Sequence, residues 1–167
     1  MDKALELLVR SESRKGILAI LRQWHLGRGS QGHAEKPGLI LVDTSVWIDF
    51  LSPSPSSAGA ELRRMIADAE PFALAGIVVT EILQGLKRDV SRIEHYLSQW
   101  EILETKGFPT YREAARIFRA ARAKGVAVTT TDALIAAIAS EHSATLFTLD
   151  KDFARIASVI RLPLYVF

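Results

Sequence analysis

Four acidic residues occupy positions from which their side chains could meet at one edge of a sheet. Asp43 and Asp150 each directly follow a predicted strand, whereas Glu81 and Asp132 lie on predicted helices that neighbour strands. In open parallel sheets, ligands bind at the carboxyl ends of the strands. Clustered carboxylates repel one another, and a hard divalent cation such as Mg²⁺ would offset that repulsion. Such ions can activate a water for phosphodiester hydrolysis, so the pattern indicates that chemistry.

Each acid also has a purely structural explanation. Asp43 could cap the helix that follows it, and Asp132 near a helix N-terminus would interact favourably with the helix dipole. Asp150 could be a turn residue. Glu81 falls outside the apolar arc of its helix, so it could be a solvated surface acid. Composition and spacing alone leave the metal site and these structural roles equally open.

The elements that must position these acids alternate between strands and helices. Short apolar runs such as LILV at 39–42 are typical of strands buried on both faces. Further predicted strands cover 72–74, 101–104, 145–149 and 162–167, and predicted helices begin near 45 and cover 58–69, 78–87, 91–100, 110–124, 132–140 and 152–157. This alternation predicts a three-layer α/β/α fold with a mainly parallel sheet of about five strands flanked by helices.

Composition excludes several classes of site. The chain has 167 residues and no cysteine, so disulfides, thiolate zinc sites, iron–sulfur clusters and a cysteine nucleophile are ruled out. No apolar run is long enough to cross a membrane, and no signal-peptide pattern opens the sequence. We therefore expect a cytoplasmic protein. The net charge is only +2, so an interaction with nucleic acid must rest on a site rather than on bulk charge.

The charge is uneven along the chain and marks a division near residue 37. Residues 1–37 hold seven basic and four acidic residues. Their pattern predicts an amphipathic helix followed by a Gly-rich linker. The linker contains the pattern GRGSQG, which matches G-x-G-x-x-G, but a helix precedes it where a dinucleotide site needs a strand. We expect an N-terminal extension over 1–37 and one folded domain over 38–167.

A basic stripe is the remaining charged feature of the predicted domain. Arg112, Arg116, Arg119 and Arg122 recur at three- and four-residue steps on one predicted helix. They could form a solvated helix face, or they could follow the backbone of a bound RNA.

The acidic positions lie within four segments that resemble the motifs of PIN-domain ribonucleases, especially the VapC-type toxins of bacterial toxin–antitoxin pairs. The segments occur in the order found in that family and together span about 38–167. They are VDTSVWIDFL at 42–51, GIVVTEILQG at 76–85, TDALIAA at 131–137 and LFTLDKDF at 146–153. Because one motif alone would be weak and four in order are specific, the resemblance favours the metal site over the separate structural roles.

The resemblance implies a PIN-like fold and Mg²⁺- or Mn²⁺-dependent endonucleolytic cleavage of RNA. Asp43, Glu81, Asp132 and Asp150 match the catalytic, metal-binding acids of the family. In similar proteins the hydroxyl at the position of Ser45, or of Thr44, helps to hold the first acid or a water on the metal. Asp152 is the alternative to Asp150 as the fourth acid.

The same resemblance implies partners. Members of the family usually form homodimers and are inhibited by a small cognate antitoxin, so we expect both for this chain, with RNA as the substrate. Two other functions stay open: a PIN nuclease of RNA maturation or decay without an antitoxin, and a catalytically weak module that binds RNA or a protein. Residues 1–37 depart from the family and could be an upstream start, a natural extension or an antitoxin-like tail that reaches the acids in cis.

Overall fold

The computed structural model describes residues 38–167, so the predictions for 1–37 lie outside the described residues. A parallel sheet forms its centre, with the strand order β3-β2-β1-β4. The strands are β1 (Ile40–Val42), β2 (Phe72–Ala75), β3 (Glu101–Leu103) and β4 (Thr145–Phe147). Every neighbouring pair runs parallel, which confirms the predicted sheet type.

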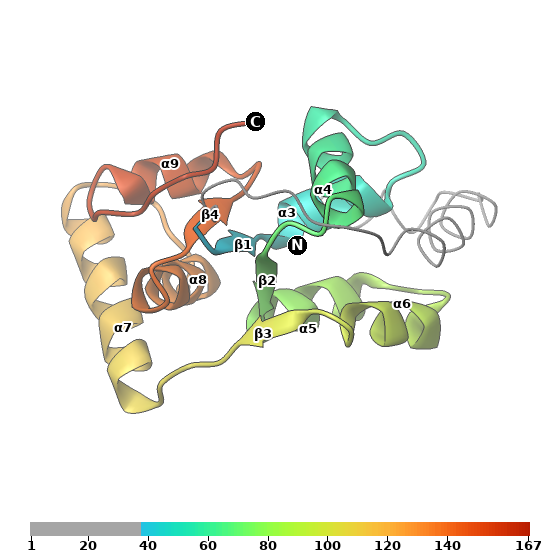
Figure 1. Cartoon of the computed structure of the whole chain (residues 1–167). Helices are drawn as coiled ribbons and strands as arrows, with labels where there is room; N and C mark the ends of the chain where they lie inside the picture. Colours follow the sequence, from blue (N-terminus) through green and yellow to red (C-terminus); the bar gives the residue numbers. More distant parts are fainter. Residues whose placement is uncertain (1–37) are drawn as a thin grey trace.

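Helices connect the strands and cover both faces of the sheet. They are α3 (Thr44–Leu51), α4 (Ser57–Ala67), α5 (Gly76–Gly85), α6 (Val90–Leu97), α7 (Phe108–Ala123), α8 (Thr130–Glu141) and α9 (Lys151–Ala157). Figure 1 shows α7 and α8 on one side of the strands and α3 to α6 on the other. The three-layer α/β/α architecture is thereby confirmed.

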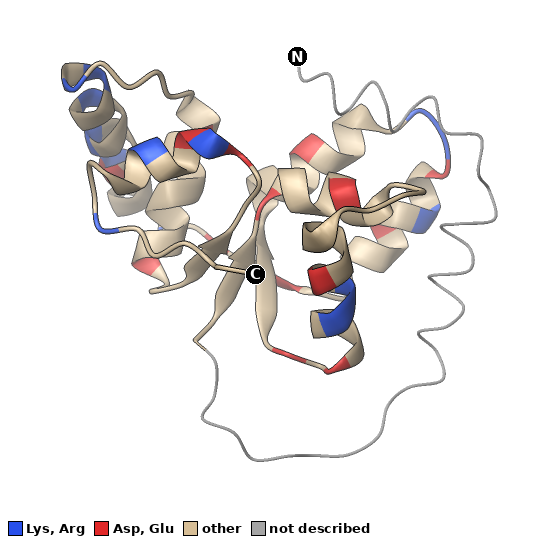
Figure 2. Cartoon of the chain, turned by 90° about the horizontal axis from the view of Figure 1, so that it is seen from above, with Lys and Arg blue, Asp and Glu red and all other residues tan. Residues whose placement is uncertain are grey.

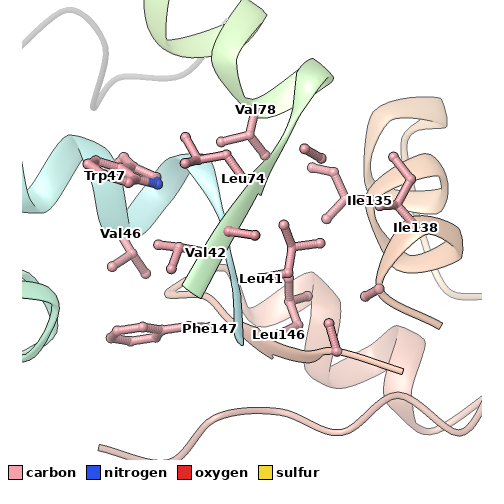
Figure 3. Packing of buried hydrophobic residues seen from close by; sticks show 14 of the residues in the cluster. Leu41, Val42, Val46, Trp47, Leu74, Val78, Ile135, Ile138, Leu146 and Phe147 are labelled. Carbon is pink, nitrogen blue, oxygen red and sulfur yellow. The ribbon is translucent and has the colours of Figure 1, made fainter. Parts of the chain in front are cut away.

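The alternation of side chains along β1 explains why both faces must be covered. Neighbouring strand residues point to opposite faces, and Leu41 and Val42 are both fully buried. Figure 3 shows Leu41 on the side of α8, near Ile135, and Val42 on the side of α3, near Trp47. A short strand that is apolar at every position can therefore lie only in the middle layer of such a fold.

The fifth predicted strand, 162–167, is the main departure of the sheet from prediction. It forms only an isolated parallel bridge between Leu146 and Leu164. Leu146 donates to the carbonyl of Pro163, and Tyr165 donates to the carbonyl of Leu146. Pro163 has no backbone N–H, so the pairing cannot extend from this bridge toward the N-terminal end of the segment.

Strand β4 is also shorter than predicted, since it ends at Phe147 rather than at residue 149. This early end leaves Thr148 and Leu149 outside the sheet, where they contact the loop after β1. Within residues 38–167, no helix is long and apolar enough to cross a membrane.

Candidate active site

Asp43 lies at the carboxyl end of β1 and begins the site. Its backbone is extended and its side chain caps α3 by accepting from the Ser45 N–H, so the predicted cap is present. The Asp43 Oδ2 atom also accepts from Ser45 Oγ at 2.7 Å and from Thr148 Oγ1 at 2.9 Å. The residue is only 4% exposed. Burial raises the pKa of Asp43, and the hydrogen bonds from Ser45 and Thr148 oppose that rise.

Glu81 joins the site through the residue that follows Asp43. Thr44 Oγ1 donates to Glu81 Oε2 at 2.6 Å, a contact that links the first turn of α3 to the middle of α5. Thr44 is itself buried, whereas Glu81 is half-buried. The two supporting hydroxyls predicted near the first acid thus divide between two acids: Ser45 holds Asp43 and Thr44 holds Glu81.

Asp150 caps α9 and is tied to the same loop as Asp43. Its side chain accepts from the N–H of Asp152, and its own N–H donates to Thr148 Oγ1 at 3.0 Å. Asp152 instead forms an ion pair with Arg155, at 2.6 Å between Oδ1 and the guanidinium. Because Asp152 is engaged with a cation and Asp150 is exposed, the contacts favour Asp150 as the fourth acid.

Asp132 lies in the first turn of α8, where it completes a capping box. Its Oδ2 accepts from the N–H of Thr129 at 2.9 Å, and its own N–H donates to Thr129 Oγ1. The structural role considered for this residue is therefore present. A carboxylate held at the helix N-terminus is also fixed in position, which a ligand of a metal ion requires.

Thr148 is the residue of the candidate site that sequence reasoning missed. Its hydroxyl donates to Asp43 and accepts from the N–H of Asp150, so one side chain connects the loops after β1 and β4. A second link runs from the N–H of Leu149 to Ser45 Oγ at 2.9 Å. The signal was present as a threonine two residues before Asp150 in the fourth motif, but it becomes visible only once β4 ends at Phe147.

The donor set of this edge of the sheet fits Mg²⁺ or Mn²⁺. Within residues 38–167, no three acidic, histidine or cysteine side chains form a preformed metal cage. Mg²⁺ keeps several waters and usually takes only one or two protein carboxylates, so such a cage is not required. Asp43 is held by neutral hydroxyls, and no Lys or Arg of the described part forms an ion pair with Asp43, Asp132 or Asp150. A buried carboxylate without a cationic side chain is suited to bind a cation.

The arginine stripe lies along α7 and is exposed, as both interpretations of it require. Arg116 forms an ion pair with Glu113 one turn away, which fits a solvated helix face. Arg122 lies over the ring of Phe118, with 5.9 Å between the guanidinium carbon and the ring centroid. Arg119 lines a groove between α7 and α8.

The sequence of this chain is similar to a known protein family and to characterised members of it. The family model for the PIN domain matches residues 40–159. Ribonuclease VapC11 of Mycobacterium tuberculosis is 34% identical over 128 residues, which cover 74% of this chain and 96% of that protein.

Two solved structures share the fold of this chain. The structure of VapBC2 from Rickettsia felis bound to a DNA fragment has a TM-score of 0.62 at 23% identity, and covers 76% of this chain and 97% of that chain. A toxin–antitoxin complex from Klebsiella pneumoniae has a TM-score of 0.50 at 26% identity, and covers 72% of this chain and 95% of that chain. The chain therefore belongs to the PIN-domain family and, within it, to the VapC ribonucleases.

Proposed function

We propose that this VapC-type ribonuclease is a Mg²⁺- or Mn²⁺-dependent endonuclease and the toxin of a type II toxin–antitoxin pair. The observation that carries the proposal is the Asp43 carboxylate, which is buried at the carboxyl end of an inner strand and held by two hydroxyls. Fold stability alone does not favour a buried carboxylate without a cationic partner. Binding of a divalent cation would compensate for that cost.

The metal would be held by Asp43, Glu81, Asp132 and Asp150, one or two of them directly and the others through its waters. When bound, the ion supplies positive charge that favours ionisation of the attacking water and stabilises charge developing on the phosphate. Ser45 and Thr148 orient the Asp43 carboxylate by donating to one of its oxygens, Oδ2. Thr44 orients Glu81 in the same way. These hydroxyls carry no charge, so they orient the acids without pairing them with a competing cation.

Cleavage of a structured RNA pool by the purified full-length chain tests the chemistry. We expect activity with Mg²⁺ or Mn²⁺ and none with EDTA. Asp43→Asn should lower the rate about 100-fold or more, because partners of metal ligands alone are worth about 10- to 100-fold. The matched control is Asp68→Asn, which removes an exposed acid that follows α4 and pairs with Arg64. Equal activity of Asp43→Asn and Asp68→Asn would contradict the proposed site, and binding without cleavage by the unaltered chain would indicate a binding module.

Two similarities support an antitoxin partner. The chain belongs to the VapC ribonucleases, and it resembles a structure from Klebsiella pneumoniae that is described as a toxin–antitoxin complex. We expect expression of the chain in a bacterial cytoplasm to arrest growth and Asp43→Asn to relieve the arrest. Co-expression of a small protein encoded next to the chain should also relieve it and should co-purify with the chain. Arrest that persists with Asp43→Asn would mean that nuclease activity is not its cause. We also expect the purified chain to be a homodimer, and sedimentation should then give the mass of two chains.

Residues 38–167 are proposed to form the nuclease domain, and residues 1–37 an extension to it. The family model begins at residue 40, which supports this division. A chain that begins at Leu39 should cleave RNA by the same metal-dependent reaction. Higher activity of the shorter chain would show that the extension inhibits the site in cis, as an antitoxin-like tail would. Equal activity would eliminate that role for the extension.

A further inference from the structure

Lys151 is a cation that directly adjoins one of the candidate acids, and neither the fold nor the metal site explains it. It follows Asp150 in sequence and is the first residue of α9. No lysine or arginine lies within four residues of Asp43, Glu81 or Asp132 along the chain. The Lys151 side chain is exposed, and no carboxylate of the described part of the chain lies within ion-pair distance of it. An uncompensated positive charge therefore adjoins an otherwise acidic site.

The backbone on both sides of Lys151 is fixed at the edge of the site. On its N-terminal side, the N–H of Leu149 donates to Ser45 Oγ at 2.9 Å, which holds this segment against the loop after β1. On its C-terminal side, the N–H of Asp152 donates to Asp150 Oδ1 at 2.8 Å. Figure 2 shows that α9, with both blue and red residues, begins beside the carboxyl ends of the strands. The flexible stem of Lys151 thus carries its ammonium group from a fixed base next to the acids.

The packing of α9 shows that the charge of Lys151 does not stabilise this helix. Phe153 and Ile156 are buried and define the face that packs against the domain. Lys151 and Arg155 are four residues apart on the opposite, exposed face, where like charges repel each other. Asp152 compensates for Arg155 through an ion pair of 2.6 Å. The charge of Lys151 is not compensated in this way and is left for an anion from outside the described part of the chain.

The substrate of a ribonuclease is such an anion. Every phosphate of the RNA backbone is negative, and the candidate acids repel it. A divalent ion at the acids would offset this repulsion at the phosphate that is cleaved. A neighbouring phosphate would still require a cation from the protein, and lysine binds phosphate as a compact point charge.

We propose that Lys151 binds a phosphate of the RNA substrate next to the phosphate that is cleaved. Its ammonium group donates to a phosphate oxygen and so holds the RNA backbone across the candidate acids. Because the contact is to the backbone, it carries no preference for a base. The proposal rests on the ribonuclease function and adds to it a residue that binds the substrate.

Binding of RNA without cleavage tests this contact. The variants are made in full-length Asp43→Asn, and their affinity for a fluorescently labelled single-stranded RNA is measured between about 50 and 200 mM salt. Lys151→Met removes the charge and keeps a long side chain, whereas Lys151→Arg keeps a cation. The matched control is Lys87→Met, at an exposed lysine between α5 and α6 that also has no ion pair in the described part of the chain. Thermal unfolding verifies that all variants are folded.

We expect Lys151→Met to weaken RNA binding about 10-fold, in line with the loss of a hydrogen bond between charged groups. The slope of log affinity against log salt should decrease in magnitude by about 0.7, because one phosphate contact to a single strand is lost. Lys151→Arg should keep most of the affinity and the slope, and Lys87→Met should change neither. With Asp43 intact, Lys151→Met should raise the KM for RNA and leave the apparent affinity for Mg²⁺ unchanged.

Three results would overturn the contact. The first is the same affinity and salt slope for Lys151→Met and Lys87→Met. The second is binding by Lys151→Arg that is as weak as binding by Lys151→Met, since the positive charge would then not matter. The third is a loss of Mg²⁺ affinity with RNA binding unchanged, since Lys151 would then act through Asp150.

The contact and the proposed chemistry fail separately, because binding is measured in a variant that is not required to cleave. Unchanged cleavage by Asp43→Asn contradicts only the proposed metal site. An unchanged salt slope in Lys151→Met, with cleavage still dependent on Asp43, contradicts only the phosphate contact.

Discussion

At the residue scale, Asp43 combines burial with neutral hydrogen-bond donors, and among residues 38–167 no cationic side chain forms an ion pair with its carboxylate. The donors come from Ser45, two residues away, and from Thr148, which is 105 residues away along the chain. A hydroxyl that holds a metal ligand in one orientation contributes to metal affinity without touching the ion. Thr148 is therefore expected to matter for activity as a positioning residue.

Thr148→Val should lower metal-dependent cleavage about 10- to 100-fold, because it removes the hydroxyl that donates to Asp43 while keeping the branched shape. The loss should include weaker apparent affinity for Mg²⁺, measured by titrating the ion in the cleavage assay. Thr148→Ser, which keeps a hydroxyl, is the matched control and should retain most of the activity. The role assigned to Thr148 would be wrong if both variants lost activity equally.

Asp43→Asn should raise the free energy of unfolding at pH 7 in EDTA. Burial raises the pKa of Asp43 in the folded chain above its value of about 3.9 in the unfolded chain. The ionised carboxylate therefore costs stability, and that cost grows as the pH rises from the unfolded to the folded pKa. Denaturant unfolding of both chains should show a difference at pH 7 that shrinks as the pH falls toward 4. A pH-independent difference would contradict the buried-charge explanation.

At the scale of elements, Asp49 near the end of α3 fixes α4 against the helix that carries the site. Asp49 Oδ2 accepts from Ser56 Oγ at 2.7 Å and from the N–H of Gly59 at 2.6 Å. The close approach is possible because Gly59 has no side chain, since a Cβ there would lie 2.7 Å from Asp49 Oδ2 and 2.9 Å from the Phe50 nitrogen. The α3–α4 pair therefore depends on a glycine inside a helix.

Gly59→Ala should lower the free energy of unfolding by about 1–3 kcal/mol, because the added methyl group overpacks the α3–α4 contact. The effect is opposite to the gain of up to about 1 kcal/mol that alanine gives over glycine in an open helix. Gly76→Ala is the control, since Gly76 also lies in a helix and a Cβ there meets nothing within 4 Å. Urea unfolding compares the two. If both changes altered the free energy of unfolding equally, the close approach of Gly59 to Asp49 would not contribute to stability.

At the scale of the whole molecule, parallel topology brings distant segments to one edge of the sheet. The loop after β1 and the loop after β4 meet because these strands are neighbours, although they lie about a hundred residues apart in sequence. Helix α5 follows β2 on the other side of β1 and brings Glu81 to Thr44. A metal held by the candidate acids at this edge would therefore link segments that are far apart along the chain.

Mg²⁺ should raise the thermal unfolding temperature of the full chain and should do so much less for Asp43→Asn. A ligand that binds only the folded state stabilises it by about 2.7 kcal/mol at a concentration 100 times its Kd. Differential scanning fluorimetry with Mg²⁺, Mn²⁺ and EDTA measures the shift. Asp68→Asn is again the control and should respond like the unaltered chain. An equal shift in Asp43→Asn would mean that the ion binds elsewhere.

The layer architecture and the positions of the acids along the chain were predictable from the sequence. Continuous apolar runs such as 39–42 can be satisfied only by a strand buried on both faces, and capping by Asp43 follows from its place between a strand and a helix. The family of the chain was also predictable, because its four motifs are local in sequence.

The contacts of the acids and the extent of the sheet could be known only from the folded structure. The bond from Thr148 to Asp43 and the bond from Thr44 to Glu81 each join residues that no local pattern pairs. The limit of the fifth strand depends on where Pro163 meets Leu146. The groove that Arg119 lines likewise exists only because α7 and α8 pack side by side. Propensity and periodicity act over a few residues, whereas burial, desolvation and hydroxyl contacts depend on the neighbours that the completed fold supplies.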